Sequence, residues 1–191
     1  MRGRQLLEWI EGLEPDARDA GVETYLNIRT CDVSSVSPGE HLIGYHQSGV
    51  DAVLQAFAEV PLQAHDVLID LGSGLGKVVM LAHLLTGAKA RGIEIQSRLV
   101  EQARGAATRL GLDVDFTQAD VRDSPLDDGT VFFLYLPFTG PVLADVLRRL
   151  EQVAKLHAIV VCALGVEVER LAPWLVPRPL DAFWLSVYDS C

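Results

Sequence analysis

Apolar residues along the chain follow two patterns, short continuous runs and longer stretches in which every third or fourth residue is apolar. Continuous runs are typical of strands that are buried on both faces, and they lie at 67–69, 131–135 and 158–163. Further strands are predicted at 90–94, 114–117 and 183–188. Helical spacing fills the intervals, at 77–85, 99–110, 141–153 and 166–174. This alternation predicts a doubly wound α/β domain, with a mostly parallel sheet and helices on both faces.

The start of the chain differs from the rest, because strands and helices alternate only after it. We therefore expect a short N-terminal helical extension or lid over residues 1–45 and the main domain over residues 46–191. Within the extension, Pro15 ends a helix whose apolar face is formed by Leu6, Trp9, Ile10 and Leu13. The main domain opens with a helix, and Ser48 is expected to cap it because it stands three residues before Asp51.

Composition and charge narrow the class of protein. The chain has 191 residues, 49% of them hydrophobic, which is enough for one domain with its own core. Its 16 basic and 26 acidic residues give a net charge of −10, so general binding to nucleic acid or to anionic membranes is not expected. No segment has the ~20 apolar residues of a membrane-spanning helix. Three cysteines without a C-x-x-C spacing are typical of a cytoplasmic, reducing location.

The most informative segment is a glycine-rich loop between a predicted strand and a predicted helix, Asp-Leu-Gly-Ser-Gly-Leu-Gly at 70–76. Glycines at such a turn let the backbone approach a ligand closely, and the helix N-terminus adds hydrogen-bond donors. Glu94 ends the next strand, 94 − 72 = 22 positions after Gly72. An acidic residue at about this spacing binds the hydroxyls of a ribose.

Three classes of ligand compete for this loop. A phosphate-binding P-loop is excluded because Leu71 stands where its first glycine belongs and Val78 where its Ser or Thr belongs. A dinucleotide fingerprint fails because Lys77 replaces its last glycine; Lys77 is instead expected to open the helix with an exposed amine. Asp70 would repel a pyrophosphate but suits a cation such as an ammonium or a sulfonium. The loop therefore favours S-adenosylmethionine.

Other candidate residues flank the loop. Asp120 and Val121 follow the strand at 114–117, where the carboxylate would accept a hydrogen bond from an adenine amine and the valine would pack on the ring; the alternative is an ordinary turn aspartate. Tyr45 and Tyr135 are expected near the acceptor, since open α/β sheets bind ligands at the carboxyl ends of their strands. Their alternative role is packing.

These residues resemble the motifs of class I S-adenosylmethionine-dependent methyltransferases, and the resemblance implies a Rossmann-like fold with a seven-stranded sheet. The segment 70–76 is similar to the family's first motif, Glu94 to the acidic end of its second strand and Asp120 to its adenine-binding acid. The resemblance extends over about residues 45–191.

Closer similarity concerns two groups of lysine methyltransferases. Asp-Leu-Gly-Ser-Gly, with Tyr45 and Ser48 upstream, resembles the Dot1-type histone-lysine enzymes and equally those that modify the ATP synthase c-subunit. Residues 183–189 are similar to the closing strand of the second group. Tyr135 stands where amide- and base-methylating relatives have Asn or Asp, which counts against a glutamine or adenine acceptor.

The resemblance implies methyl transfer to an amine, such as a protein lysine. A small-molecule acceptor and a non-catalytic protein that binds the cofactor are the alternatives. We expect no metal site, and Tyr45 and Tyr135 as the residues that orient the acceptor. The predicted cofactor-binding residues are Asp70, Gly72, Ser73, Gly74, Gly76, Glu94, Asp120 and Val121.

Overall fold

The computed structural model of the protein contains one seven-stranded sheet. It describes residues 1–28, 38–135, 137–165, 168–182 and 184–191. The strands are β1 (Val67–Leu71), β2 (Lys89–Glu94), β3 (Asp115–Gln118), β4 (Val131–Tyr135), β5 (Val160–Leu164), β6 (Leu175–Pro177) and β7 (Leu185–Ser190). Their order is β3-β2-β1-β4-β5-β7-β6, and β7 runs antiparallel to both of its neighbours. The predicted doubly wound, mostly parallel sheet is confirmed.

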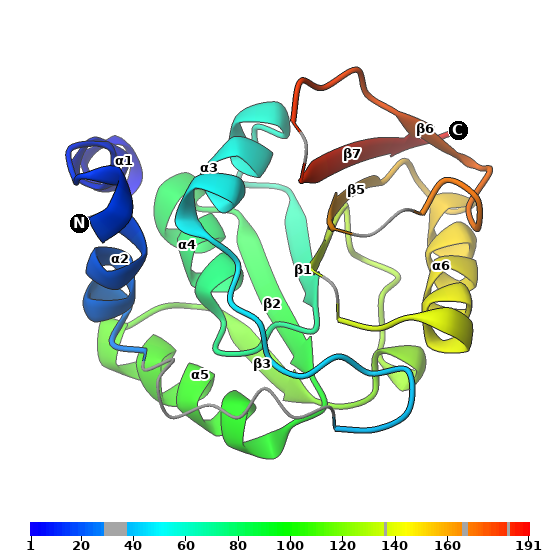
Figure 1. Ribbon diagram of the computed structural model, residues 1–191, viewed down its shortest axis with the longest axis horizontal. Coiled ribbons are helices and arrows are strands. Elements are labelled where there is room, and N and C mark those ends of the chain that lie inside the picture. Colours follow the sequence, from blue (N-terminus) through cyan, green and yellow to red (C-terminus); the bar gives the residue numbers. More distant parts are fainter. Residues whose placement is uncertain (29–37, 136, 166–167, 183) are drawn as a thin grey trace.

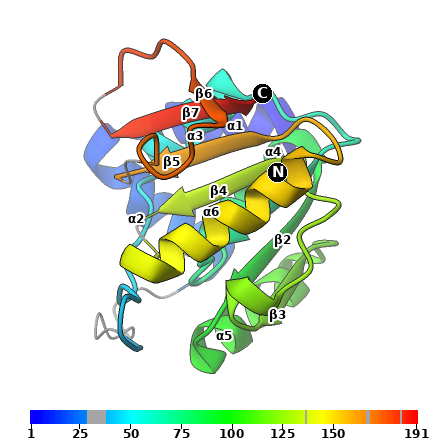
Figure 2. The same cartoon turned by 90° about the vertical axis from the view of Figure 1, so that its right-hand side faces the viewer.

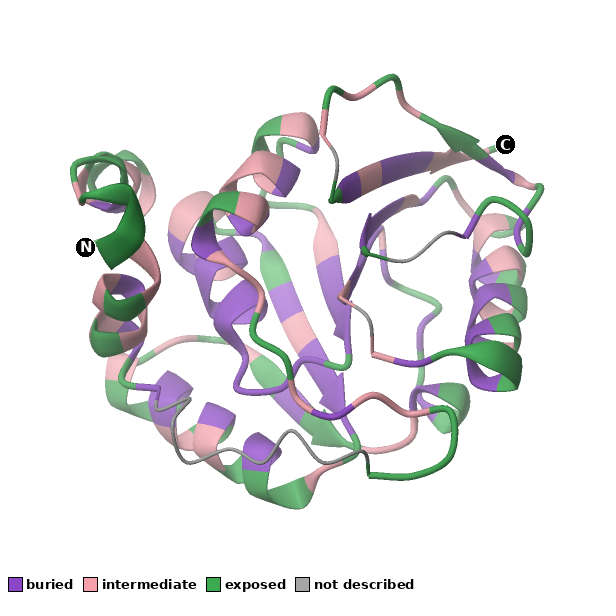
Figure 3. Cartoon of the chain, viewed as in Figure 1, coloured by how far each residue is buried: buried purple, intermediate pink, exposed green. Residues whose placement is uncertain are grey.

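Helices cover both faces of this sheet (Figures 1 and 2). Their bounds are α1 (Gly3–Glu11), α2 (Arg18–Leu26), α3 (Val50–Glu59), α4 (Lys77–Thr86), α5 (Ser97–Leu110) and α6 (Gly140–Ala154), with 3-10 turns at Pro15–Ala17 and Val121–Asp123. One apolar cluster contains residues of the helices α1, α2, α3, α4 and α5 and of one face of the sheet. A second cluster contains residues of α6 and of the other face. Figure 3 shows the buried residues lining the inner sides of these layers.

The N-terminal helices belong to the first of these clusters. Leu6 and Ile10 of α1 and Val22 and Leu26 of α2 are fully buried. Helix α1 packs on α4, and α2 packs on α3, α4 and α5. Residues 1–28 therefore share one core with the sheet.

Two local predictions are wrong. No helix forms over residues 168–174, where a single helical turn follows Val168 and Pro173 prevents its extension; residues 166–167 lie outside the described part of the chain. The chain instead adds β6, an edge strand that the sequence pattern does not announce. Ser48 is not the cap of α3 either. That helix follows Gly49, and its first amide, that of Val50, donates to the carboxylate of Asp19.

Within the described ranges, no helix combines the length and the apolar character that crossing a membrane requires.

The shared core yields a stability prediction for α1. Ile10→Ala should lower the free energy of unfolding of the whole domain by about 2–4 kcal/mol, because it leaves a cavity between α1 and α4. Glu11→Ala, at an exposed position of the same helix, should change it by less than about 0.5 kcal/mol. Denaturant unfolding followed by circular dichroism measures both. An unchanged midpoint for Ile10→Ala would mean that α1 is not part of the cooperative core.

Candidate functional site

Two adjoining pockets open at the carboxyl ends of β1, β2 and β4. The order of the strands reverses between β1 and β4, which is the point where open α/β sheets bind ligands. The first pocket holds about 600 Å³ of space not filled by protein atoms, part of it open to solvent. The second lies beside the glycine loop. Four residues line both pockets: Tyr45, His46, Gly72 and Tyr135. The two pockets therefore form one elongated site.

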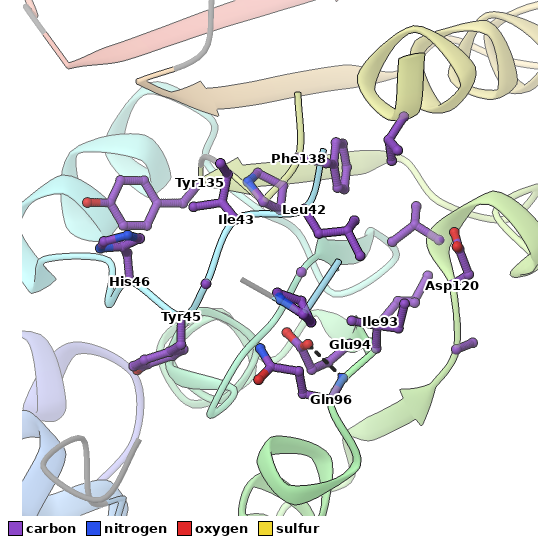
Figure 4. Close-up of a pocket in the computed structure, with 18 residues that line it drawn as sticks. Leu42, Ile43, Tyr45, His46, Ile93, Glu94, Gln96, Asp120, Tyr135 and Phe138 are labelled. Atoms are coloured by element: carbon purple, nitrogen blue, oxygen red, sulfur yellow. Dashed lines mark hydrogen bonds between the residues drawn. The ribbon is translucent and has the colours of Figure 1, made fainter. Parts of the chain in front are cut away.

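The glycine loop is fixed by hydrogen bonds to the end of β2. The amides of Gly72 and Ser73 donate to the carbonyl of Ile93, at 2.8 and 3.0 Å. The amide of Gly74 donates to Oε2 of Glu94 at 3.0 Å, while Oε1 accepts from the amide of Gln96 at 2.9 Å (Figure 4). Glu94 is 7% exposed, and both of its oxygens are held in place. Each oxygen keeps a further lone pair for a ligand.

Asp70 is the least compensated charge of the site. It is the penultimate residue of β1, is 4% exposed, and makes no side-chain hydrogen bond with another described residue. Burial, with the nearby charge of Glu94, raises the pKa of Asp70 to about 8. A buried carboxylate without a partner is costly, and a cation in the second pocket would remove that cost.

The glycines make room for protein side chains as well as for a ligand. A Cβ at position 74, where φ is +51°, would lie 2.4 Å from the ring of Tyr45. A Cβ at position 72, where φ is +92°, would lie 2.5 Å from Pro137. Any other residue at either position would displace the tyrosine or the proline.

Tyr45, His46 and Tyr135 come together at the shared part of the pockets. Figure 4 shows Tyr135 and His46 at the opposite end of the site from Asp120. Burial and the neighbouring carboxylates of Glu23 and Asp70 raise the pKa of Tyr45 above its usual value. Tyr45 therefore carries a neutral hydroxyl at physiological pH and is not a base.

Asp120 lines the first pocket, but its carboxylate already has a partner. Its two oxygens accept from the guanidinium of Arg122, at 2.7 Å for the shortest contact, and Oδ1 also accepts from the Arg122 amide. The bond to Arg122 lowers the pKa of Asp120. Val121 beside it is buried and lines the same pocket. Asp120 thus lies at the site, and its carboxylate also makes the local hydrogen bonds that are typical of an aspartate in a turn.

Sequence reasoning missed part of the pocket wall. The missed lining residues include Leu42, Ile43, Ile95, Gln96, Pro137 and Phe138. The amide of Ile43 donates to the carbonyl of Pro137 at 3.1 Å, and Leu42 forms a β-bridge with Phe138. This pairing between distant segments leaves no trace in local sequence. Ile95 and Gln96 could have been found, since they directly follow Glu94.

Lys77 contradicts its predicted exposure. Its side chain is 4% exposed, and the ammonium bonds Asp19, Glu23 and the carbonyl of Ser48. Ser73 is also buried, and its hydroxyl has no hydrogen-bond partner among the described residues. That hydroxyl lies against Gly92, where a Cβ would come within 2.3 Å of it, so it faces β2.

Comparison with known proteins bears directly on this site. Residues 68–157 match the family profile described as a methyltransferase domain. These residues form a methyltransferase domain. It contains β1, the glycine loop, Glu94, Asp120 and β4, and its fold places it in the class I, S-adenosylmethionine-dependent type.

Solved structures resemble the methyltransferase domain and the elements around it. An RNA methyltransferase of Salinibacter ruber, in complex with S-adenosyl-L-homocysteine, is 28% identical, with a TM-score of 0.61 over 76% of this chain and 92% of that one. An S-adenosylmethionine-dependent methyltransferase of Aquifex aeolicus is 16% identical and shares the fold, with a TM-score of 0.56 over 72% of this chain and 88% of that one.

A curated relative adds a short sequence match. An uncharacterized protein of Methanocaldococcus jannaschii is 39% identical over 59 residues, which cover 31% of this chain and 27% of that protein. The chain thus matches only about a quarter of the length of this relative.

The isolated charge of Asp70 predicts how stability depends on pH. The folded pKa of about 8 exceeds the unfolded value of 3.8, so the stabilising effect of the neutral carboxyl is complete below pH 4 and lost as the pH rises to 8. Asp70→Asn should abolish this decline and be more stable than the wild type at pH 8, by at least about 1 kcal/mol. Denaturant titrations of the ligand-free protein at pH 5 and pH 8 measure the difference. Asp113→Asn, at an exposed position, is the control, and equal pH dependence of all three proteins would contradict the assignment.

Proposed function

We propose that the protein transfers a methyl group from S-adenosylmethionine to an amine nitrogen, foremost the ε-amino group of a lysine on a protein. When bound, the cofactor supplies a methyl carbon that is already activated by its sulfonium. The remaining work of the protein is to align the acceptor and to exclude water. The observation that carries the proposal is the pair of buried carboxylates, Asp70 and Glu94, on either side of the glycine loop in a methyltransferase domain.

The residues of the site fit the cofactor from one end to the other. Asp70, a buried carboxyl without a hydrogen-bond partner in the described part of the chain, suits the ammonium of the methionine part. Glu94, whose oxygens are oriented by two backbone amides, suits the ribose hydroxyls. Val121 would pack on the adenine, and Asp120 would accept from its amine in addition to Arg122. Gly72, Ser73, Gly74 and Gly76 shape the loop between these groups.

Tyr45 and Tyr135 are the residues that would orient the acceptor. Both line the part of the site that the two pockets share. A tyrosine at position 135 offers a ring and a hydroxyl but no amide or carboxylate to hold a planar amide or a base. An aliphatic amine needs no such group, which favours lysine over glutamine or adenine.

The charge of the site supports a cationic acceptor. The carboxylate of Glu94 lines it, together with that of Asp120, which is paired with Arg122. Asp70, with its pKa of about 8, adds negative charge as the pH rises through 8. Lys77, which also lines the site, is neutralised by its own carboxylate partners. The chain as a whole carries a net charge of −10. Such a field attracts a protonated lysine, and the attraction weakens as salt is added. Carboxylates also keep the pKa of the lysine high, so its proton must be lost to solvent before the nitrogen can react.

An RNA acceptor is the second candidate, because the Salinibacter ruber protein of 28% identity is an RNA methyltransferase. The acidic site argues against phosphate contacts, so we place this candidate second. A small-molecule amine is the third. The three candidates predict that the transferred methyl group is found on protein, on RNA or on a small molecule, respectively.

Glu94→Ala should weaken binding of S-adenosylhomocysteine by about 1–3 kcal/mol, the usual loss for hydrogen bonds to a charged group. Asp120→Ala should act in the same direction but less, because Arg122 already occupies its carboxylate. Isothermal calorimetry on variants that keep a folded circular dichroism spectrum measures both. Glu101→Ala, exposed on α5, serves as the control. Wild-type affinity in Glu94→Ala would overturn the ribose assignment.

The acceptor is found by transfer of radiolabelled methyl into size-separated lysate fractions, each treated with protease or with RNase, followed by mass spectrometry. We expect label on protein that protease removes, with the methyl group on a lysine nitrogen. The rate should rise from pH 7 to pH 9, because free lysine titrates near ~10.4, and should fall with added salt. Label that RNase removes would favour the RNA acceptor, and label in the small-molecule fraction would favour the third candidate.

A further inference from the structure

The starting point is the unexpected burial of Lys77, the first residue after the glycine loop. Its ammonium donates to Oδ1 of Asp19 at 2.9 Å, to Oε1 of Glu23 at 2.8 Å and to the carbonyl of Ser48 at 3.1 Å. An ammonium has three protons, so each one has an acceptor. Asp19 and Glu23 both belong to α2, in the N-terminal part of the chain.

Asp19 has a second function in the same place. Its Oδ1 accepts from the amide of Val50 at 3.0 Å, and α3 has no side-chain cap of its own. Helix α2 thus supplies the cap of α3 and the counter-charge of Lys77 with one carboxylate. Together, Lys77, Asp19 and Glu23 form what we call the Lys77 cluster, which joins α2, the start of α3 and the end of the glycine loop.

The Lys77 cluster holds one end of the segment that carries Tyr45. The carbonyl of Ser48 accepts from Lys77 at this end. At the other end, the amide of Ile43 donates to the carbonyl of Pro137 and the carbonyl of His41 accepts from the amide of Thr139. Between these two attachments the ring of Tyr45 lies against Gly74, at the shared part of the pockets.

A purely stabilising role explains this arrangement poorly. Lys77 is 4% and Glu23 13% exposed, and taking such a pair out of water costs about as much as its attraction returns. Asp19 is 43% exposed, so solvent screens its attraction, and the cluster as a whole adds little net stability. What such a cluster supplies is a defined geometry, since a lysine with three fixed acceptors has one position. The element that this geometry fixes is the segment 44–48 beside the ligand loop.

We propose that Lys77, Asp19 and Glu23 are positioning residues that hold Tyr45 against the glycine loop, and that the N-terminal helices thereby complete the methyl-transfer site. The inference rests on the proposed function for its effect on ligand binding. It assigns to α2 a role beyond packing, and it assigns to Lys77 a role other than that of an exposed amine at the start of a helix. Loosening the cluster releases Tyr45 and weakens binding at the shared part of the pockets.

The test removes the charge of Lys77 together with that of Glu23, its more buried partner. Asp19, whose side chain is 43% exposed, keeps the amide of Val50 as a hydrogen-bond donor. The double variant Lys77→Met/Glu23→Gln is compared with Asp51→Asn, which breaks the exposed ion pair of 2.7 Å between Arg18 and Asp51. That pair also joins α2 to α3, so the control alters the same helix contact without touching the cluster. The single variant Glu23→Gln, which keeps Lys77 and Asp19, is the milder alternative if the double variant does not fold.

Two measurements read the result. Fluorine NMR of protein labelled with 3-fluorotyrosine follows the four tyrosines, with Tyr45 assigned from Tyr45→Phe. Calorimetry measures the affinity for S-adenosylhomocysteine. We expect the double variant to shift or broaden the Tyr45 signal, to leave that of Tyr188 in β7 unchanged, and to bind roughly tenfold more weakly or worse, as displaced site geometry does. Asp51→Asn should match the wild type in both.

The outcomes separate the two proposals. A folded double variant with the wild-type Tyr45 signal overturns the positioning role. A wild type that fails to bind S-adenosylhomocysteine at millimolar concentration overturns the proposed cofactor site, while the fluorine spectra still decide whether the cluster holds Tyr45. A shifted Tyr45 signal with unchanged affinity would also contradict the inference, because the cluster would then not contribute to the site.

Discussion

The attachment of the glycine loop to the end of β2 is the constraint on which the site depends. Three consecutive amides, from Gly72 to Gly74, donate to Ile93 and Glu94, so the loop crosses from β1 toward β2 before α4 begins. This crossing brings the carboxylates of Asp70 and Glu94 into one pocket. It also turns the loop so that Tyr45 and Pro137 fill the space beside its glycines. Without these bonds the two carboxylates would face different surroundings.

The site combines unfavourable electrostatics with firm attachment. Asp70 is buried without a hydrogen-bond partner among the described residues, and the charge of Glu94 nearby adds repulsion. Such a pocket lowers the stability of the ligand-free protein, and a ligand that brings positive charge recovers part of that loss. The parts of the chain around the pocket are fixed by hydrogen bonds. The segment before α3 is hydrogen-bonded to the loop after β4, and α2 is bonded to the start of α4 through Asp19 and Lys77.

Features that depend on local sequence could be predicted, and those that depend on distant partners could not. The apolar run at 131–135 became β4 with the same bounds, and the helix predicted at 99–110 ends where Gly111 takes a left-handed conformation. Asp70, Glu94 and the glycines were found because a strand, a loop and a helix follow one another without interruption. The cover of the pocket was missed because Leu42 and Phe138 meet only in three dimensions. Lys77 was judged exposed because its acceptors lie 54 and 58 residues away.

The cap of α3 has a consequence for the order of folding. Most helices find their cap in the preceding residue, so their first turn is specified as soon as that turn forms. Here the first amide of α3 is satisfied by a side chain 31 residues earlier in the chain. The start of α3 therefore becomes defined only after α2 has docked beside it. The same docking brings counter-charges to Lys77, so the ligand pocket is expected to be among the last parts of the molecule to take its final shape.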